Sequence, residues 1–315
     1  MLSTAPRLLL RSQRPGAAPS DAPSAGTGRE LLALLRGAAA GTPAGRPRFD
    51  PGLAGGLRAW LEDAAYGLVA LRGDDAAPLV LGPRHLLGGD EDHSGATTAP
   101  PGAPGACQGA PAPADPAPAN GALEARLVHA LFRQLVHTGT VGDPLAEALD
   151  ALGATGATAS VRAVESLPTS ARDALAGSLA AQAANLRALV PRFASGWMPR
   201  TDDHVSIPLA GGRVVLQGTF DLLVGTPSPG TASLCALGLS TGGPWPRDRQ
   251  RLHYLALLEA LRSGTPPFRL ALIESTSGRY GVEDVREEHL RALSSHIVAW
   301  LAREGQPHPS GGNRA

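Results

Sequence analysis

A hairpin followed by shorter apolar strands constrains the fold of this chain more than any other feature. Residues 204–209 and 213–225 are β-rich runs joined by a Gly-Gly pair, which is typical of a tight turn between antiparallel strands. Residues 233–239 and 268–274 are short apolar runs of the kind that is buried on both faces of a sheet. The sequence therefore predicts a sheet built mainly from the second half of the chain.

Segments before, between and after these strands have apolar residues at helical spacing. The predicted helices cover residues 123–135, 143–152, 169–192, 249–262 and 287–303. Asp143 before Pro144, and Ser170, are expected N-caps. This order of helix, three strands, helix, strand and helix predicts a mixed α/β sheet with helices on both faces.

Composition divides the chain into packed and unpacked parts. Gly (39) and Pro (29) make up over a fifth of the 315 residues, so a sizeable part is not expected to pack. We expect disorder in residues 1–28, a flexible insertion or linker at 93–121, a domain at 122–303 and a disordered tail at 304–315. Residues 29–92 read as a helical segment that packs on the core.

Three segments within residues 29–92 are expected to form secondary structure. Glu30 begins a short helix, and Asp50-Pro51 provides a cap and first turn for an amphipathic helix. Residues 78–81 follow as a short strand.

Charge and cysteine content exclude several classes of function. Acidic and basic residues balance at 28 each, and every basic residue is Arg, so no lysine can act as an acid, base or phosphate ligand. Cys107 and Cys235 form no Cys-x-x-Cys pair, which excludes zinc ribbons and four-cysteine iron–sulfur clusters. No apolar run is long enough to span a membrane, so we expect a cytoplasmic protein without a membrane partner.

An aspartate in an apolar strand is the best candidate site residue. Asp221 follows Gly218-Thr219-Phe220 and precedes two leucines. Asp is disfavoured in strands and costly to bury without a partner, so it requires a reason. A metal-binding carboxylate is one reason, and a capped or exposed Asp is the other.

Three further patterns accompany Asp221. His129 ends an Arg-Leu-Val-His run on the first helix of the predicted domain. Residues 236–242 form an apolar strand that ends in Ser-Thr-Gly, with Gly238 and Ser240 at alternate positions. Gln250 and Tyr254 lie four residues apart on the following helix, which places them on one helix face.

Together these patterns resemble the PD-(D/E)XK nuclease superfamily, in particular its RecB-type branch in a form found in high-GC actinobacteria. The resemblance covers residues 122–303 and implies a restriction-endonuclease-like core. It implies that Asp221 and His129 belong to an Mg²⁺ site and that Gln250 and Tyr254 organise the site and contact DNA. Asp202 lies where related sequences carry an acid before the hairpin.

The same resemblance implies that catalysis is lost. Gly238 stands where the family has its second acid, and Ser240 stands where it has its lysine. A metal that polarises the phosphate and lowers the pKa of water needs anionic ligands, and a hydroxyl cannot replace an ammonium group. We therefore expect an inactive nuclease-fold domain that binds nucleic acid or protein, with weak or absent Mg²⁺ binding.

Two alternatives stay open. One is an active Mg²⁺-dependent DNA nuclease whose second acid has moved to Glu259 or Glu274. The other is a different α/β fold.

Contact with DNA is a separate question. Arg247, Arg249 and Arg251 surround Gln250 and could bind phosphate. They could equally be a solvated helix start. The sequence does not specify the partner or the oligomeric state.

Overall fold

The computed structural model describes residues 24–25, 27–35, 48–73, 76–86, 120–225, 233–242 and 245–305. The segments that the composition marks as disordered or flexible, at 1–28, 93–121 and 304–315, lie outside the described residues except at their ends.

Seven strands in the described residues form one mixed sheet. They are β1 (Ser24–Ala25), β2 (Leu79–Leu81), β3 (Arg200–Leu209), β4 (Val214–Val224), β5 (Cys235–Ser240), β6 (Arg269–Glu274) and β7 (Arg279–Asp284). Their order is β1-β7-β6-β5-β4-β2, with β3 also paired to β4. β5 and β6 are parallel, as are β2 and β4, and the other pairs are antiparallel.

One edge of β4 is shared by two strands. β5 pairs with β4 at residues 222–224 and β2 pairs with it at residues 214–216, while β3 runs along the whole of the other edge. Residues 217–221 of β4 therefore have no partner strand on the shared edge among the described residues. Buried backbone groups that lack a ladder partner need other partners. The candidate site lies at this gap.

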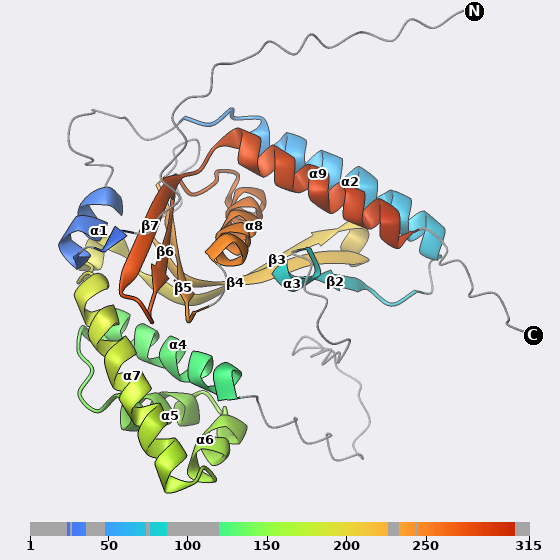
Figure 1. The fold of residues 1–315 in the computed structure, drawn as a ribbon. Helices are drawn as coiled ribbons and strands as arrows, with labels where there is room; N and C mark the ends of the chain where they lie inside the picture. The colour runs from blue at the N-terminus through green and yellow to red at the C-terminus, as the bar shows by residue number, and fades with distance from the viewer. Residues whose placement is uncertain are drawn as a thin grey trace, which may run out of the picture.

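Helices cover both faces of the sheet, which confirms the predicted mixed α/β class (Figure 1). The helices are α1 (Gly28–Leu35), α2 (Leu53–Arg72), α3 (Pro83–Leu86), α4 (Asn120–Thr138), α5 (Pro144–Ala154), α6 (Thr158–Glu165), α7 (Thr169–Leu189), α8 (Trp245–Ser263) and α9 (Glu287–Glu304).

The first face is covered by α8, with α2 and α9 side by side above it (Figure 1). Leu57 and Leu61 of α2, Phe220 of β4, Leu255 of α8 and Ile297 of α9 share one buried cluster on this face. Residues of the N-terminal segment therefore contribute to the same core as the sheet.

The second face is covered by α1 and the group α4 to α7 (Figure 1). Leu127 and Phe132 of α4, Leu186 of α7, Leu237 of β5 and Ile273 of β6 belong to its buried cluster. Because both faces are covered, every residue of β5 is buried, as the continuous apolar run predicts.

Several local expectations are confirmed. Asp143 caps α5 by accepting bonds from the backbone N–H groups of Leu145 and Ala146, both at 3.1 Å. The hairpin turns through Gly211 and Gly212, whose φ angles of 64° and 86° favour glycine.

Two predicted caps are wrong. The N-cap of α7 is Pro168, and Ser170 lies inside the helix. Asp50 accepts from the N–H of Gly52 at 2.8 Å, but α2 begins only at Leu53 and its N-cap makes no side-chain bond. α2 begins at its first buried residue, Leu53, whereas the first turn of α7 is exposed, so burial does not set where α7 begins.

Candidate functional site

Asp221 lies where β4 and β5 separate, and it is only 7% exposed. Its Oδ2 accepts a bond of 2.8 Å from the backbone N–H of Leu239, which lies beyond the last residue of β5 that pairs with β4. The guanidinium group of Arg251 on α8 forms an ion pair with the same oxygen. Nδ1 of His129 on α4 lies 3.4 Å from the other oxygen, Oδ1.

These contacts explain why an acid is tolerated in an apolar strand. A buried carboxylate is costly unless it is hydrogen-bonded and paired with a cation. Asp221 has an amide donor, a guanidinium and an imidazole around it, contributed by β5, α8 and α4. The predicted proximity of His129 and Asp221 is therefore present in the structure.

A second acid–base pair lies beside the first. Arg133 follows His129 by four residues on α4 and forms an ion pair with Asp202 of β3. Asp202 lies between two positions of β3 that pair with Phe220 and Leu222, so it is opposite Asp221. Its φ of 52° marks a local distortion of the strand.

Gly238 and Ser240 do not add ligands to this cluster. A Cβ atom at Gly238 would lie 3.0 Å from Cδ2 of Leu252, so the space beside this residue is filled by α8. Ser240 is 2% exposed, and its Oγ has no hydrogen-bond partner among the described residues.

The expected roles of Gln250 and Tyr254 are not supported by their positions. Gln250 is exposed and is not among the residues that contact Asp221. Tyr254 is fully buried, and its hydroxyl lies 2.9 Å from the carbonyl oxygen of Leu81 and 3.2 Å from that of Gln217. Burial raises the pKa of this phenol, so it remains a donor. Tyr254 thus joins β2 to the unpaired part of β4.

The three arginines predicted to contact phosphate are placed differently from one another. Arg251 forms an ion pair with Asp221, so its charge is compensated within the protein, and its role as a nucleic-acid contact stays a prediction. Arg249 donates two bonds to Glu283 of β7, at 2.9 and 2.7 Å. Arg247 is exposed at the start of α8. Arg249 and Arg251 are therefore already paired with carboxylates.

Glu283 is the centre of a compact charged group. Besides Arg249 it contacts Nε2 of His253 at 2.8 Å. Burial alone would raise the pKa of Glu283, but the bonds from His253 and Arg249 outweigh it and hold the pKa at about 2.

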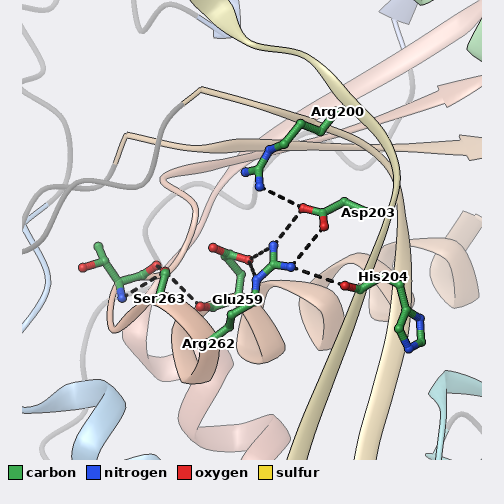
Figure 2. Close-up of polar contacts among 7 residues, drawn as sticks. Arg200, Asp203, His204, Glu259, Arg262 and Ser263 are labelled. Carbon is green, nitrogen blue, oxygen red and sulfur yellow. Dashed lines mark hydrogen bonds and ion pairs between the residues drawn. The ribbon is translucent and has the colours of Figure 1, made fainter. Parts of the chain in front are cut away.

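Glu259, one candidate for a relocated acid, belongs to a separate cluster (Figure 2). The guanidinium of Arg262 lies between Glu259 and Asp203, with Nε 2.8 Å from Glu259 Oε2 and two bonds of 3.1 and 2.9 Å to Asp203. Arg200 Nη1 lies 3.2 Å from the same Asp203. Since Glu259 follows Arg251 by eight positions, these two residues of the two clusters lie about 12 Å apart along α8.

The two carboxylates of Figure 2 have opposite pKa shifts. Burial raises the pKa of Glu259, and the charge of Arg262 only partly opposes this. For Asp203 burial also acts upward, but the hydrogen bond and charge of Arg262 outweigh it and the pKa is lowered. The shifts therefore favour the ionised form of Asp203 and the protonated form of Glu259, which is the more deeply buried of the two acids.

Glu274, the other candidate acid, lies on β6 in register with Ser240. Its carboxylate accepts a hydrogen bond from the hydroxyl of Ser277 in the turn before β7. It therefore ends a strand and holds the following turn, one strand further from Asp221 than Ser240 is.

With Arg251 in place, the residues around Asp221 do not fit a divalent metal. One carboxylate oxygen already carries an amide donor and a guanidinium, and Gly238, where the resemblance implies a second acid, has no side chain to add. Within the part of the chain that the structure describes, no group of three or more His, Cys, Asp or Glu side chains is arranged to hold a metal ion. A cation of charge +2 would also meet the positive charge of Arg251.

Sequence reasoning missed the role of Arg251. One signal was present, because Arg251 precedes Leu255 and Leu258 by four and seven residues and therefore shares their helix face. Both leucines are buried, at 1% and 0% exposed.

The fold and this site define a mixed α/β protein with a buried Asp–Arg pair where two strands separate. No protein-family model matches the chain, and no curated protein sequence matches it. None of the described helices has the length and apolar character needed to cross a bilayer.

Proposed function

We propose that this chain is a catalytically inactive member of the PD-(D/E)XK superfamily, RecB-type branch, that acts as a binding or assembly module. Support comes from the order of elements, in which a helix precedes β3, β4 and β5, and α8 and β6 follow. The antiparallel β4–β5 pair and the parallel β5–β6 pair agree with a mixed core of this kind.

The Asp221–Arg251 ion pair carries the proposal of inactivity. Phosphodiester hydrolysis on this fold requires a metal to polarise the phosphate and to lower the pKa of the attacking water. Arg251 neutralises Asp221, the acid that the resemblance assigns to the metal, and Leu252 packs where a second acid at position 238 would extend. The chain also has no lysine, and arginine stays protonated and cannot act as a base.

A nuclease assay tests this proposal. Single-stranded and nicked DNA are incubated with the full chain and Mg²⁺ or Mn²⁺, beside the Asp221→Ala variant. We expect no cleavage above the level of that variant. Cleavage that depends on the metal and disappears in Asp221→Ala would show an active enzyme.

The alternative of a relocated acid is tested in the same assay. Glu259 and Glu274 are each held by other side chains, so we expect Glu274→Gln and Glu259→Gln to leave the result unchanged. Cleavage by the wild type that is lost in one of these two variants would support the relocated acid.

We propose protein rather than nucleic acid as the bound partner. Net charge is zero, and Arg249 and Arg251 are already paired with carboxylates. Affinity for DNA that falls steeply with salt requires several cations available to phosphate. We expect no such dependence between low and moderate salt, measured by fluorescence anisotropy with labelled single-stranded DNA. A steep slope that is reduced in Arg247→Ala would support DNA binding instead.

A further inference from the structure

We infer that Arg251 serves as a built-in cation that takes the place of a divalent metal at Asp221, and that removing its charge opens a metal site there. This inference rests on the proposed loss of activity, and it attributes that loss to one side chain, Arg251. It concerns the two acid oxygens, the imidazole of His129 and the guanidinium group between α8 and β4.

The contacts of Asp221 divide between its two oxygens. Oδ2 takes the guanidinium of Arg251 and the N–H of Leu239, whereas Oδ1 has Nδ1 of His129 at 3.4 Å. The side chains of Arg251 and His129 are 28% and 32% exposed, so both can be reached from solvent. A carboxylate with an adjacent imidazole suits Mn²⁺, which accepts oxygen and nitrogen ligands.

Electrostatics explains why the charge of Arg251 determines whether Asp221 can bind a metal ion. The guanidinium compensates the buried carboxylate, so the site is neutral without a metal. A divalent cation at Asp221 would lie within a few ångströms of this positive charge and would be repelled. Without the guanidinium, the carboxylate is left without its counter-ion, and a cation can compensate it.

The test measures Mn²⁺ binding to the full chain by electron paramagnetic resonance of the free ion. The variants are Arg251→Met, which keeps an aliphatic side chain without the charge, and Arg251→Lys, which keeps the charge. Arg251→Gln is a second neutral variant that still offers Asp221 a hydrogen-bond donor. Circular dichroism establishes that each variant is folded.

We expect the wild type and Arg251→Lys to leave Mn²⁺ free. Arg251→Met and Arg251→Gln should bind it at least about tenfold more tightly, because a repulsive unit charge is removed. Adding Asp221→Asn to either neutral variant should abolish this binding, and adding His129→Gln should weaken it.

Two results would contradict different conclusions. If both folded neutral variants bind Mn²⁺ no better than the wild type, Arg251 does not stand in for a metal, although the chain can still be inactive. If the wild type itself binds Mn²⁺ through Asp221, the proposed inactivity fails as well.

Discussion

At the scale of single residues, the two members of the Asp221–Arg251 pair should contribute unequally to stability. Asp221 is 7% exposed, whereas the side chain of Arg251 is 28% exposed and can reach water. Arg251→Met leaves a buried unpaired carboxylate and should cost about 3 kcal/mol, since breaking a buried pair in this way is strongly destabilising. Asp221→Asn keeps the shape and leaves the exposed partner solvated, so it should cost about 1 kcal/mol.

Urea denaturation followed by circular dichroism measures both changes in the free energy of unfolding. If both variants lose the same free energy of unfolding, the burial of Asp221 does not make the loss of Arg251 the more destabilising change. The larger expected loss is below the stability of a typical domain, so both variants should remain folded.

Glu259 gives a pH dependence whose sign can be worked out. Burial raises its pKa above the ordinary value of 4.5, so the folded state binds a proton more tightly than the unfolded state. The resulting stabilisation is complete below pH 4.5 and is lost as the pH rises through the folded pKa. Glu259→Gln does not titrate and escapes this loss.

We therefore expect the stability of Glu259→Gln relative to the wild type to improve between pH 4.5 and pH 7. Thermal unfolding at several pH values measures the difference. Asp203 beside it has a lowered pKa, so Asp203→Asn should show the opposite trend, becoming relatively less stable as the pH rises through the ordinary carboxyl range. A difference between Glu259→Gln and wild type that does not change with pH would contradict the assignment.

At the scale of elements, Tyr254 closes the gap in the edge of β4. Its hydroxyl reaches the carbonyl oxygen of Leu81, the last residue of β2, and that of Gln217, which lies just beyond the last residue of β4 that pairs with β2. Tyr254→Phe should cost about 1–2 kcal/mol, because a buried acceptor loses its donor. Urea denaturation measures this. No loss of stability would mean that water or another group satisfies these carbonyls.

Sequence periodicity predicts the elements whose apolar faces are continuous and misses those that depend on distant partners. The buried run of β5 and the helices α4, α8 and α9 follow from their own residues. β7 reads Arg-Tyr-Gly-Val-Glu-Asp, and only Tyr280 is buried, so its strand pattern is weak. The eight-residue α6 is too short to give a clear helical period.

Some residues of the candidate site could be predicted from the sequence, and others could not. Asp221 and His129 could be predicted because an acid inside an apolar strand needs a partner. The spacing of Arg251 to Leu255 and Leu258 places it on a buried face of α8, but its partner could not be predicted, because which strand that face meets is set by how α8 packs on the sheet. Tyr254 lies in the buried part of α8, whereas Gln250 precedes the first buried residue of this helix, Leu252, and is exposed.

At the scale of the whole molecule, the boundary predicted at residue 122 cuts through one core. α2 packs beside α9 and β2 extends the sheet beside β4. Leucines from these two N-terminal elements are buried within the same cluster as α8 and β4: Leu53, Leu57, Leu61, Leu68 and Leu81. The domain assigned from the resemblance is therefore smaller than the unit that packs together.

A chain that begins at residue 120 should consequently fail to fold stably. Burial of a leucine contributes about 1.5–3 kcal/mol, so five of them contribute about as much as the whole stability of a typical domain. The shortened chain should show no cooperative thermal transition and should be digested rapidly by protease. A matched chain that begins at residue 27 keeps α1, α2 and β2 and should unfold cooperatively, near the midpoint of the full chain. If the chain from residue 120 unfolds with that same midpoint, the N-terminal elements do not contribute to stability. The buried leucines of α2 and β2 would then not be needed to stabilise the sheet and α8.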